Sequence, residues 1–152
     1  MKNIQLIVLL SCICWGSKAQ NKIKMETQKE KIAAISDVLE NRYFKGIYEG
    51  NAALLSTAYH PGALLFGDVK GQPYAKNLAE YLDGVAHRQS PKDSGKPFHG
   101  EILKISTVNS IAIAEVKVKM YDFYYHDYLS FHNIDGQWLI VNKMMTDTAD
   151  QI

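Results

Sequence analysis

Asp127 is the residue of this sequence best suited to carry chemistry. It stands in a stretch of period-two pattern, Tyr125 to Phe131, where the side chains that share its face are apolar or aromatic. A carboxylate on such a face is costly unless it is paired, hydrogen-bonded or solvated within a cavity. We therefore expect a pocket beside Asp127, in which it acts as a general base or orients a ligand. The alternative is a structural carboxylate bonded to Asn142, Tyr43 or a backbone amide.

Histidines are a second possible source of acid–base chemistry. His60 precedes Pro61-Gly62 at a break in the pattern, where it would be an acid or base at the pocket mouth or a corner residue bonded to local backbone. His126 and His132 are expected on the outer face of their strand. His126 also points away from its neighbour Asp127, so the two cannot grip one metal ion together. No spacing resembles HExxH or a facial triad, and we predict no metal and no cofactor.

Aromatic side chains are frequent enough to form the walls of a pocket for a flat ligand. The hydroxyls of Tyr43 and Tyr125 are expected to point into it. Plain core packing is the alternative for the whole set. The sequence thus predicts a small hydrophobic or aromatic molecule as ligand, bound by Tyr43, Phe66, Tyr125, Asp127, Phe131, Trp138 and Asn142.

Helices are predicted in the first half of the chain. Thr27 and Glu30 have the capping-box spacing, and apolar residues from Ile32 to Ile47 recur at helical spacing within a helix over 27–48. Asn51 can cap a second short helix that ends at Tyr59. The next segments are predicted as a short strand over 63–66, a polar turn over 67–73, a third helix over 75–88 and a loop over 90–97.

The hydrophobic period changes to two from His99 onward, which is typical of strands. Four strands are predicted, over 99–108, 111–120, 124–134 and 137–145. Asp135-Gly136 is the strongest hairpin signal of the chain. Helices followed by a meander of strands indicate an α+β fold, with a curved antiparallel sheet packed on N-terminal helices.

The same turn predicts the register of the last hairpin. It places Ile134 opposite Gln137, Phe131 opposite Ile140, Leu129 opposite Asn142 and Asp127 opposite Met144. Trp138, Ile140, Asn142 and Met144 then share the concave face with Asp127. Lys143 is expected on the outer face, as a solvated lysine or in a salt bridge between two copies of the chain.

The N-terminal segment is typical of a signal peptide. Lys2 supplies a positive charge, the apolar run from Ile4 to Trp15 is too short to span a bilayer, and cleavage is expected after Ala19. A buried N-terminal helix is the alternative. The predicted parts are a signal peptide over 1–19, a flexible leader over 20–26, the folded domain over 27–146 and a tail over 147–152.

Export would leave a mature chain without cysteine, because Cys12 and Cys14 both lie in the signal segment. The segment Leu9-Leu10-Ser11-Cys12 also loosely resembles a lipoprotein cleavage site, which would leave a lipid anchor on Cys12. The predicted location is the bacterial periplasm or the extracellular space, with no membrane span in the mature domain. The formal net charge of +1 gives no reason to expect a nucleic acid partner.

Several segments resemble one known family in their order and spacing. They are Tyr43-Phe44-Lys45-Gly46-Ile47-Tyr48-Glu49-Gly50-Asn51, His60-Pro61-Gly62-Ala63-Leu64-Leu65-Phe66-Gly67, Asp127-Tyr128-Leu129-Ser130 and residues 134–143. They resemble the nuclear transport factor 2-like (NTF2-like) superfamily over residues 28–146, in the branch labelled "putative lumazine-binding" beside the polyketide-cyclase-like (SnoaL-like) proteins. The resemblance implies a cone-shaped α+β roll of the cystatin-like kind, a cavity between sheet and helices, and homodimers through the outer sheet face.

The fold does not imply one function, and three functions remain open. The preferred one is an exported, non-catalytic domain that binds a small, partly aromatic molecule. The second is a cofactor-independent isomerase, dehydratase or cyclase with Asp127 as base and Tyr43 or His60 as acid. The third is an interaction module that dimerises through the outer face, where Tyr128, His132, Leu139 and Val141 are expected.

Overall fold

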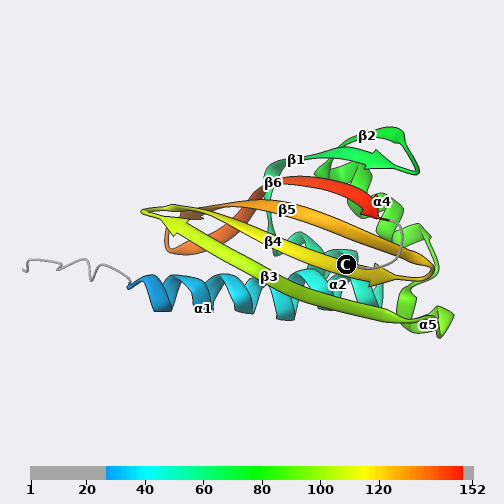
Figure 1. Cartoon of the computed structure of the whole chain (residues 1–152), viewed down its shortest axis with the longest axis horizontal. Helices are drawn as coiled ribbons and strands as arrows, with labels where there is room; N and C mark the ends of the chain where they lie inside the picture. Colours follow the sequence, from blue (N-terminus) through cyan, green and yellow to red (C-terminus); the bar gives the residue numbers. More distant parts are fainter. Residues whose placement is uncertain (1–26, 149–152) are drawn as a thin grey trace, which may run out of the picture.

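The computed structural model describes residues 27–148. The predicted signal peptide, the leader over 20–26 and the last four residues lie outside this described part. Within it, helices precede a six-stranded sheet in the α+β order that the sequence predicts. Figure 1 shows the sheet curving over a long N-terminal helical segment. Within residues 27–148, no helix is both long and apolar enough to cross a bilayer.

The N-terminal helical segment is continuous but changes its winding. It comprises α1 (Gln28–Val38), a π-helical turn (Leu39–Phe44) and α2 (Lys45–Glu49). The predicted capping box is present, since the Glu30 amide donates to the Thr27 hydroxyl at 3.2 Å and the Thr27 amide donates to the Glu30 carboxylate at 2.8 Å. The π-helical turn carries Tyr43, which is fully buried. Such turns are rare and frequently occur at functional sites.

Gly50 separates the first helical segment from a second, short helix. Gly50 ends α2 in the left-handed conformation with φ of 64°, and Asn51 caps α3 (Ala52–Ser56) by accepting a hydrogen bond from the Leu54 amide at 2.9 Å. The predicted capping role of Asn51 is confirmed. The helix itself ends three residues earlier than expected, because the chain enters β1 at Tyr59.

The segment after α3 differs from the prediction. The expected short strand over 63–66 is an eleven-residue strand, β1 (Tyr59–Val69), and the expected turn and first helical residues form β2 (Gln72–Asn77), which pairs with it. Lys70 and Gly71, with φ of 53° and 68°, make the tight turn between them. The helix α4 (Leu78–His87) begins only after Asn77, which caps it together with Glu80. The predicted loop over 90–97 contains a short helix, α5 (Pro91–Ser94).

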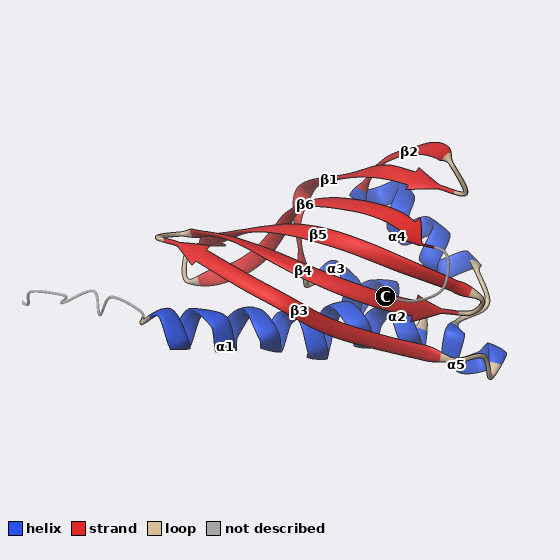
Figure 2. Cartoon of the chain, viewed as in Figure 1, coloured by secondary structure: helices blue, strands red, loops and turns tan. Residues whose placement is uncertain are grey.

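The C-terminal half is the predicted meander. Its strands are β3 (Phe98–Val108), β4 (Ile111–Met120), β5 (Phe123–Ile134) and β6 (Gln137–Thr148). The sheet order is β2-β1-β6-β5-β4-β3, and β1 runs parallel to β6 whereas all other neighbours are antiparallel. Figure 2 shows the helices on one side of this curved sheet.

The last hairpin departs from the predicted register at Val141. The pairs Ile134–Gln137 and Phe131–Ile140 are as predicted, but Ser130 then pairs with Asn142 and Leu129 with Lys143. Val141 is therefore an extra residue in β6, a β-bulge. Because one extra residue reverses the side-chain alternation beyond it, Lys143 turns inward with 4% of its surface exposed, and Met144 turns outward with 56% exposed. The predicted inward position of Asn142 and outward position of Lys143 are both wrong.

The core lies between the concave sheet face and the helices. β4 shows the predicted alternation, with Ala114, Val116 and Val118 buried under the helices and charged side chains between them. Tyr125, Asp127, Leu129 and Phe131 of β5 share the concave face, as predicted from the period of two. This arrangement leaves a polar group, Asp127, among apolar neighbours.

Candidate functional site

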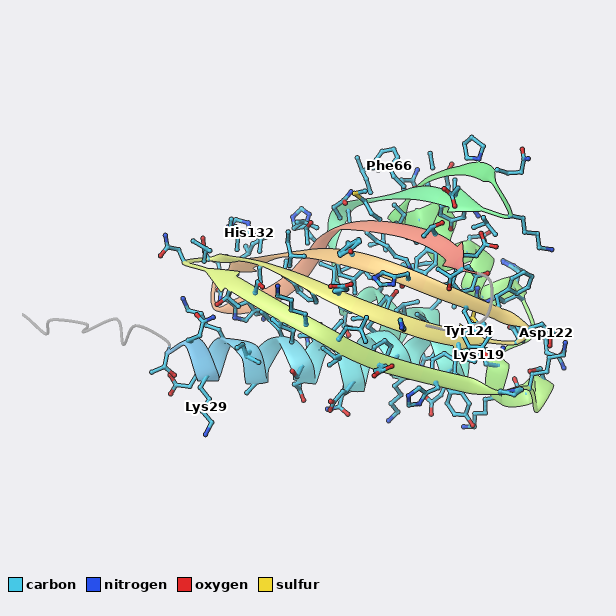
Figure 3. The ribbon with its side chains drawn as sticks, in the orientation of Figure 1. Lys29, Phe66, Lys119, Asp122, Tyr124 and His132 are labelled. Carbon is cyan, nitrogen blue, oxygen red and sulfur yellow. The ribbon has the colours of Figure 1, made fainter. Side chains whose placement is uncertain are left out.

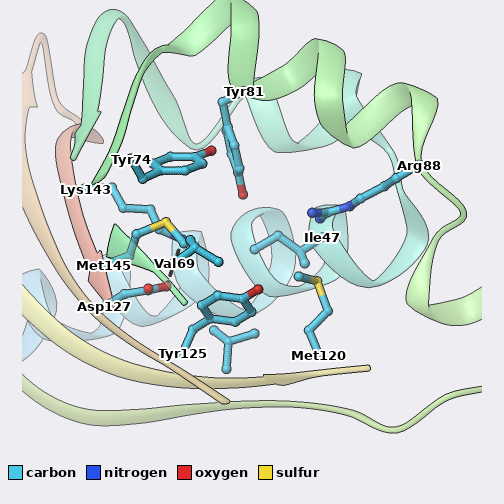
Figure 4. Close-up of a pocket in the computed structure, with 11 residues that line it drawn as sticks. Ile47, Val69, Tyr74, Tyr81, Arg88, Met120, Tyr125, Asp127, Lys143 and Met145 are labelled. Atoms are coloured by element: carbon cyan, nitrogen blue, oxygen red, sulfur yellow. Dashed lines mark ion pairs between the residues drawn. The ribbon is translucent and has the colours of Figure 1, made fainter. Parts of the chain in front are cut away.

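A cavity of about 230 Å³ lies between the concave sheet face and the helices (Figure 4). The sheet supplies residues from β1, β2, β4, β5 and β6, and the helical side supplies one residue of α2, one of α4 and the residue after α4. Most of the lining is apolar or aromatic. The lining residues are Ile47, Val69, Tyr74, Tyr81, Arg88, Val118, Met120, Tyr125, Asp127, Lys143 and Met145.

Three polar side chains form a closed triangle at one end of this cavity. The Lys143 ammonium lies 2.9 Å from Asp127 Oδ2, and Tyr43 donates its hydroxyl hydrogen to the same oxygen at 2.7 Å. Lys143 donates in turn to the Tyr43 hydroxyl oxygen at 2.7 Å. Asp127 and Tyr43 are completely buried, and Lys143 is nearly so. The chain therefore holds a buried ion pair that a phenol bridges, and we call these three residues the polar triangle.

The surroundings of Lys143 and Tyr43 keep both groups protonated at neutral pH. Burial is the largest single influence on Lys143 and lowers its pKa, but the charge and hydrogen bond of Asp127, together with Tyr81 and Tyr74, raise the pKa by more. Burial, and then the charge of Asp127, raise the pKa of Tyr43 well above its ordinary value. Lys143 is thus an ammonium and Tyr43 a neutral phenol, which agrees with the directions of their hydrogen bonds.

One oxygen of the triangle is left without a partner. Asp127 Oδ1 is buried and accepts no hydrogen bond from any residue within 27–148. A buried carboxylate oxygen in this state costs free energy, which a donor from a bound molecule would recover. Since Asp127 lines the cavity, a ligand hydroxyl or N–H is the natural donor.

Aromatic rings surround the approach to the triangle. Tyr74, Tyr81 and Tyr125 line the cavity, and the Lys143 ammonium lies 5.8 Å from the centroid of the Tyr81 ring. Burial raises the pKa of Tyr74 and of Tyr125, so both hydroxyls are neutral donors. Flat rings with neutral hydroxyls suit a planar ligand that carries polar groups at its edges.

Some of the residues predicted for the site lie at the cavity, and others do not. Tyr125 and Asp127 line the cavity. Tyr43 does not, contrary to the prediction that its hydroxyl points into the cavity, because this hydroxyl is bonded to Asp127 and Lys143 behind the lining. Phe131 and Trp138 are buried in the core away from the cavity lining, with 1% and 3% of their surface exposed.

Two other predicted positions, those of Phe66 and Asn142, are wrong, and His60 has the local backbone role that was one of its two predicted roles. Phe66 is 46% exposed and points away from the sheet (Figure 3), because its neighbour Leu65 takes the inward position in β1. Asn142 donates to the Leu64 carbonyl oxygen at 3.1 Å instead of facing Asp127, as the bulge at Val141 requires. His60 lies outside the cavity lining, and its Nδ1 accepts the Gly62 amide at 3.1 Å, the local bond given above as its alternative role.

Two charged residues of the site were missed from the sequence. Lys143 is expected on the outer face from the sequence, and no sequence pattern predicts the bulge that turns it inward. Arg88 follows α4, and nothing in its sequence surroundings distinguishes it from an ordinary surface arginine. Within residues 27–148, no group of three or more His, Cys, Asp or Glu side chains is arranged to hold a metal ion.

Comparison with known proteins identifies a family whose sequences resemble this chain and solved structures with a similar fold. The sequence profile of the family described as "Putative lumazine-binding" matches residues 30–146. An NTF2-like protein of unknown function from Shewanella baltica has a TM-score of 0.72 at 21% identity, over 82% of this chain and 98% of its own. An NTF2-like protein of unknown function from Methylobacillus flagellatus also has a TM-score of 0.72, at 24% identity over 82% and 98% of the two chains.

A curated relative with a named activity also matches. "Aldolase FrzH" from a Cladobotryum species is 27% identical over 105 residues, which are 67% of this chain and 80% of the relative. The structural similarities establish the NTF2-like fold, and the profile covers most of the described residues.

Proposed function

This chain belongs to the "Putative lumazine-binding" family of NTF2-like proteins, and from that premise we propose that its cavity binds a small planar organic molecule. The observation that carries the proposal is the polar triangle of Tyr43, Asp127 and Lys143 at the wall of an otherwise apolar and aromatic cavity. A buried ion pair is a weak device for stability, since apolar residues of similar size usually serve as well. Its position beside a cavity supports a role toward a ligand instead.

The unpartnered Asp127 Oδ1 supports a ligand that donates a hydrogen bond at this end. The rings of Tyr74, Tyr81 and Tyr125 support a flat body of limited size. A rigid planar molecule loses little conformational entropy on binding, so a cavity of about 230 Å³ can bind it well.

The test is to purify the protein without added ligand and to record native mass spectra and a crystal structure. A mass adduct, or density in the cavity that contacts Asp127, is the expected result. Asp127→Asn should weaken binding of that molecule. Because this change leaves the Lys143 ammonium without its partner, circular dichroism must first show that the variant is folded. An empty cavity closed by collapsed side chains, with no binding from a library of planar aromatics, would overturn the proposal.

A second candidate function is a cofactor-independent enzyme of carbonyl chemistry. It is favoured by the free Asp127 Oδ1 and by the similarity to a protein named an aldolase. In such a reaction the Asp127 carboxylate takes a proton from the carbon next to a carbonyl group. The electron pair of that C–H bond forms a carbon–carbon double bond, the π pair of the carbonyl group moves onto its oxygen, and the Lys143 ammonium stabilises the resulting enolate. Tyr43 and His60 both lie outside the cavity lining, so Asp127 itself returns the proton to the product.

The protonation state of Lys143 distinguishes two possible mechanisms, one with an imine on Lys143 and one with Asp127 as general base. An amine whose pKa is raised is a poor nucleophile at neutral pH, which disfavours an imine and favours general-base catalysis. NMR in D₂O should show exchange of α-protons in a panel of small ketones and aldehydes, with loss of exchange in Asp127→Asn. Exchange that survives this substitution, or trapping of a Lys143 adduct by borohydride, would contradict the general-base form.

We also propose that two copies of the chain associate through the outer sheet face. Apolar side chains are exposed there, among them Val108, Ile111 and Ile113 at 65%, 57% and 53%, and they surround a shallow groove that includes His132 and Val141. Exposed apolar patches of this kind usually mark an interface. Sedimentation equilibrium should give twice the chain mass at micromolar concentration, and a monomer at high concentration would contradict the proposal.

Export is the last part of the proposed function. The sequence of residues 1–19 supports cleavage after Ala19, with lipidation of Cys12 as the alternative. Intact mass of the protein recovered from a bacterial periplasm or culture medium separates these outcomes. A chain that keeps residues 1–19 in the cytoplasm would overturn the proposal.

A further inference from the structure

Arg88 presents an uncompensated positive charge to the cavity. It follows the last residue of α4, and its extended backbone, with φ of −88° and ψ of 153°, ends the helix there. Figure 4 shows its guanidinium pointing into the cavity from the side opposite Asp127 and Lys143. Its Nε is buried and has no hydrogen-bond partner within residues 27–148.

The charges that line the cavity do not cancel. They belong to Arg88, Lys143 and Asp127, and Asp127 is already paired with Lys143 at 2.9 Å. The cavity lining therefore carries a net charge of +1, and this charge resides on Arg88. A buried guanidinium N–H without an acceptor is costly, and the planar fork of arginine matches a carboxylate or another delocalised oxyanion.

Within residues 27–148, Arg88 makes no ion pair with a carboxylate. The Asp147 carboxylate acts on Tyr125 but is not part of the cavity lining. The tyrosines Tyr74 and Tyr125, which line the same cavity, are both neutral at physiological pH. Burial raises the pKa of each hydroxyl, and the positive charges of Arg88 and Lys143 oppose this rise at both. A bound molecule can therefore supply the acceptor that the buried Nε of Arg88 lacks.

We propose that the cavity is specific for a planar organic monoanion. The anionic oxygens of this ligand accept hydrogen bonds from Arg88, and its hydroxyl or N–H group donates a hydrogen bond to Asp127 Oδ1. This inference rests on the proposed binding function and narrows it to one class of ligand. Arg88 is then the residue that selects for charge, and Asp127 the residue that orients the ligand. A neutral molecule of the same shape leaves the half-buried Arg88 charge without an anionic partner.

The test uses three rigid probes of almost equal size. They are 6-hydroxy-2-naphthoate, its neutral amide 6-hydroxy-2-naphthamide, and 2-naphthoate, which lacks the hydroxyl group. Isothermal titration calorimetry with the full chain measures the three affinities. We expect the hydroxynaphthoate to bind roughly 10- to 100-fold more tightly than its amide, as a charge-assisted hydrogen bond to a buried group predicts.

Variants at Arg88 and Asp127 assign the effect to its residues. Arg88→Gln should remove the preference for the anion and leave the amide affinity within about threefold, whereas Arg88→Lys should keep part of it. Arg42→Gln is the matched control, because Arg42 is also half-buried but lies outside the cavity lining and bonds the Thr57 carbonyl. Asp127→Asn should reduce the advantage of the hydroxyl group, and the preference for the anion should persist or grow, because Lys143 then loses its counter-ion.

The outcomes distinguish the proposed preference for an anion from the binding of a planar ligand as such. If the amide binds as tightly as the naphthoate, or if Arg88→Gln keeps the anion preference, the inference is wrong while ligand binding stands. If none of the probes binds and no planar ligand is found by the native mass spectra described above, both the inference and the proposed function fail.

Discussion

At the residue scale, the polar triangle joins stability and function. Asp127 and Lys143 are each tolerated in the core only because the other is present, with Tyr43 bonded to both. Removing one charge from such a pair leaves the other buried and uncompensated, whereas removing both charges leaves neither. Measurements of folding stability therefore test whether the ion pair of the site is formed.

The first prediction concerns Lys143→Met. We expect the free energy of unfolding in urea to fall by about 3–5 kcal/mol, because the Asp127 carboxylate loses its partner. The double variant Asp127→Asn with Lys143→Met should recover a large part of this loss. Lys45→Met, at an exposed position of α2, is the matched control and should stay within about 0.5 kcal/mol of the parent. Equal effects at Lys143 and Lys45 would contradict the buried pair.

The second prediction concerns alkaline pH. The pKa values of Tyr43 and Lys143 are raised in the folded state above 10.0 and 10.5, their ordinary values. A raised pKa means that the folded state holds its proton longer than the unfolded state, so its stabilising effect is complete below pH 10 and is lost as pH rises further. Urea unfolding between pH 7 and 11 should show this decline. Tyr43→Phe should flatten the decline, and an unchanged slope would contradict the assignment.

At the element scale, two local irregularities build the site. The π-helical turn Leu39–Phe44 carries Tyr43, and the bulge at Val141 turns Lys143 inward toward it. β6 is held in place on its other side by the parallel strand β1, where Gly67 pairs with Met145. The position of Lys143 thus depends on how closely β1 approaches β6.

The third prediction tests this close approach. Gly67 has φ of +146°, and a Cβ added there would lie 1.7 Å from the Met145 carbonyl oxygen. Gly67→Ala should therefore destabilise the fold by at least about 2 kcal/mol in urea unfolding, through strain and displacement of β1. Gly71→Ala is the matched control, because Gly71 has φ of +68° but no atom within 4 Å of the added Cβ. A loss at Gly67 no larger than at Gly71 would show that β6 does not depend on this contact.

At the scale of the whole molecule, the curved sheet has two unequal faces. Its concave face is covered by the helices, while its outer face exposes apolar side chains around Ile113. Polar pairs also lie on the outer face, such as His126 and Glu115, whose Nε2 and Oε1 atoms are 2.8 Å apart. A mixture of apolar patch and polar surroundings resembles the layout of protein interfaces.

The fourth prediction concerns this outer face. Ile113→Lys should shift the proposed dimer to monomer in sedimentation equilibrium, because a buried unpaired charge is costly. The melting temperature of the monomer and the affinity for planar ligands should be nearly unchanged, since Ile113 is not in the cavity lining. Ala53→Lys, an exposed position of α3, introduces the same charge on the helical side and should leave the dimer intact. Dissociation by both variants would point to a general charge effect.

The sequence by itself determined the features that depend on neighbouring residues. Capping boxes, the hairpin at Asp135-Gly136 and the alternation along β4 and β5 are local, and they were enough to predict the α+β fold and the buried position of Asp127. The second capping box, Asn77 with Glu80, was also present in the sequence and marks the true start of α4.

Tertiary structure decided which partner Asp127 received. The bulge at Val141 has no local sequence signal, and side-chain alternation amplifies one extra residue into a reversal of every later position in β6. The bulge turns Lys143 instead of Asn142 toward Asp127, so that the partner of Asp127 is an ammonium group and not the expected amide. The entry of Arg88 into the same cavity likewise follows from the packing of α4 over the sheet, a relation between distant segments that spacing along the chain cannot encode.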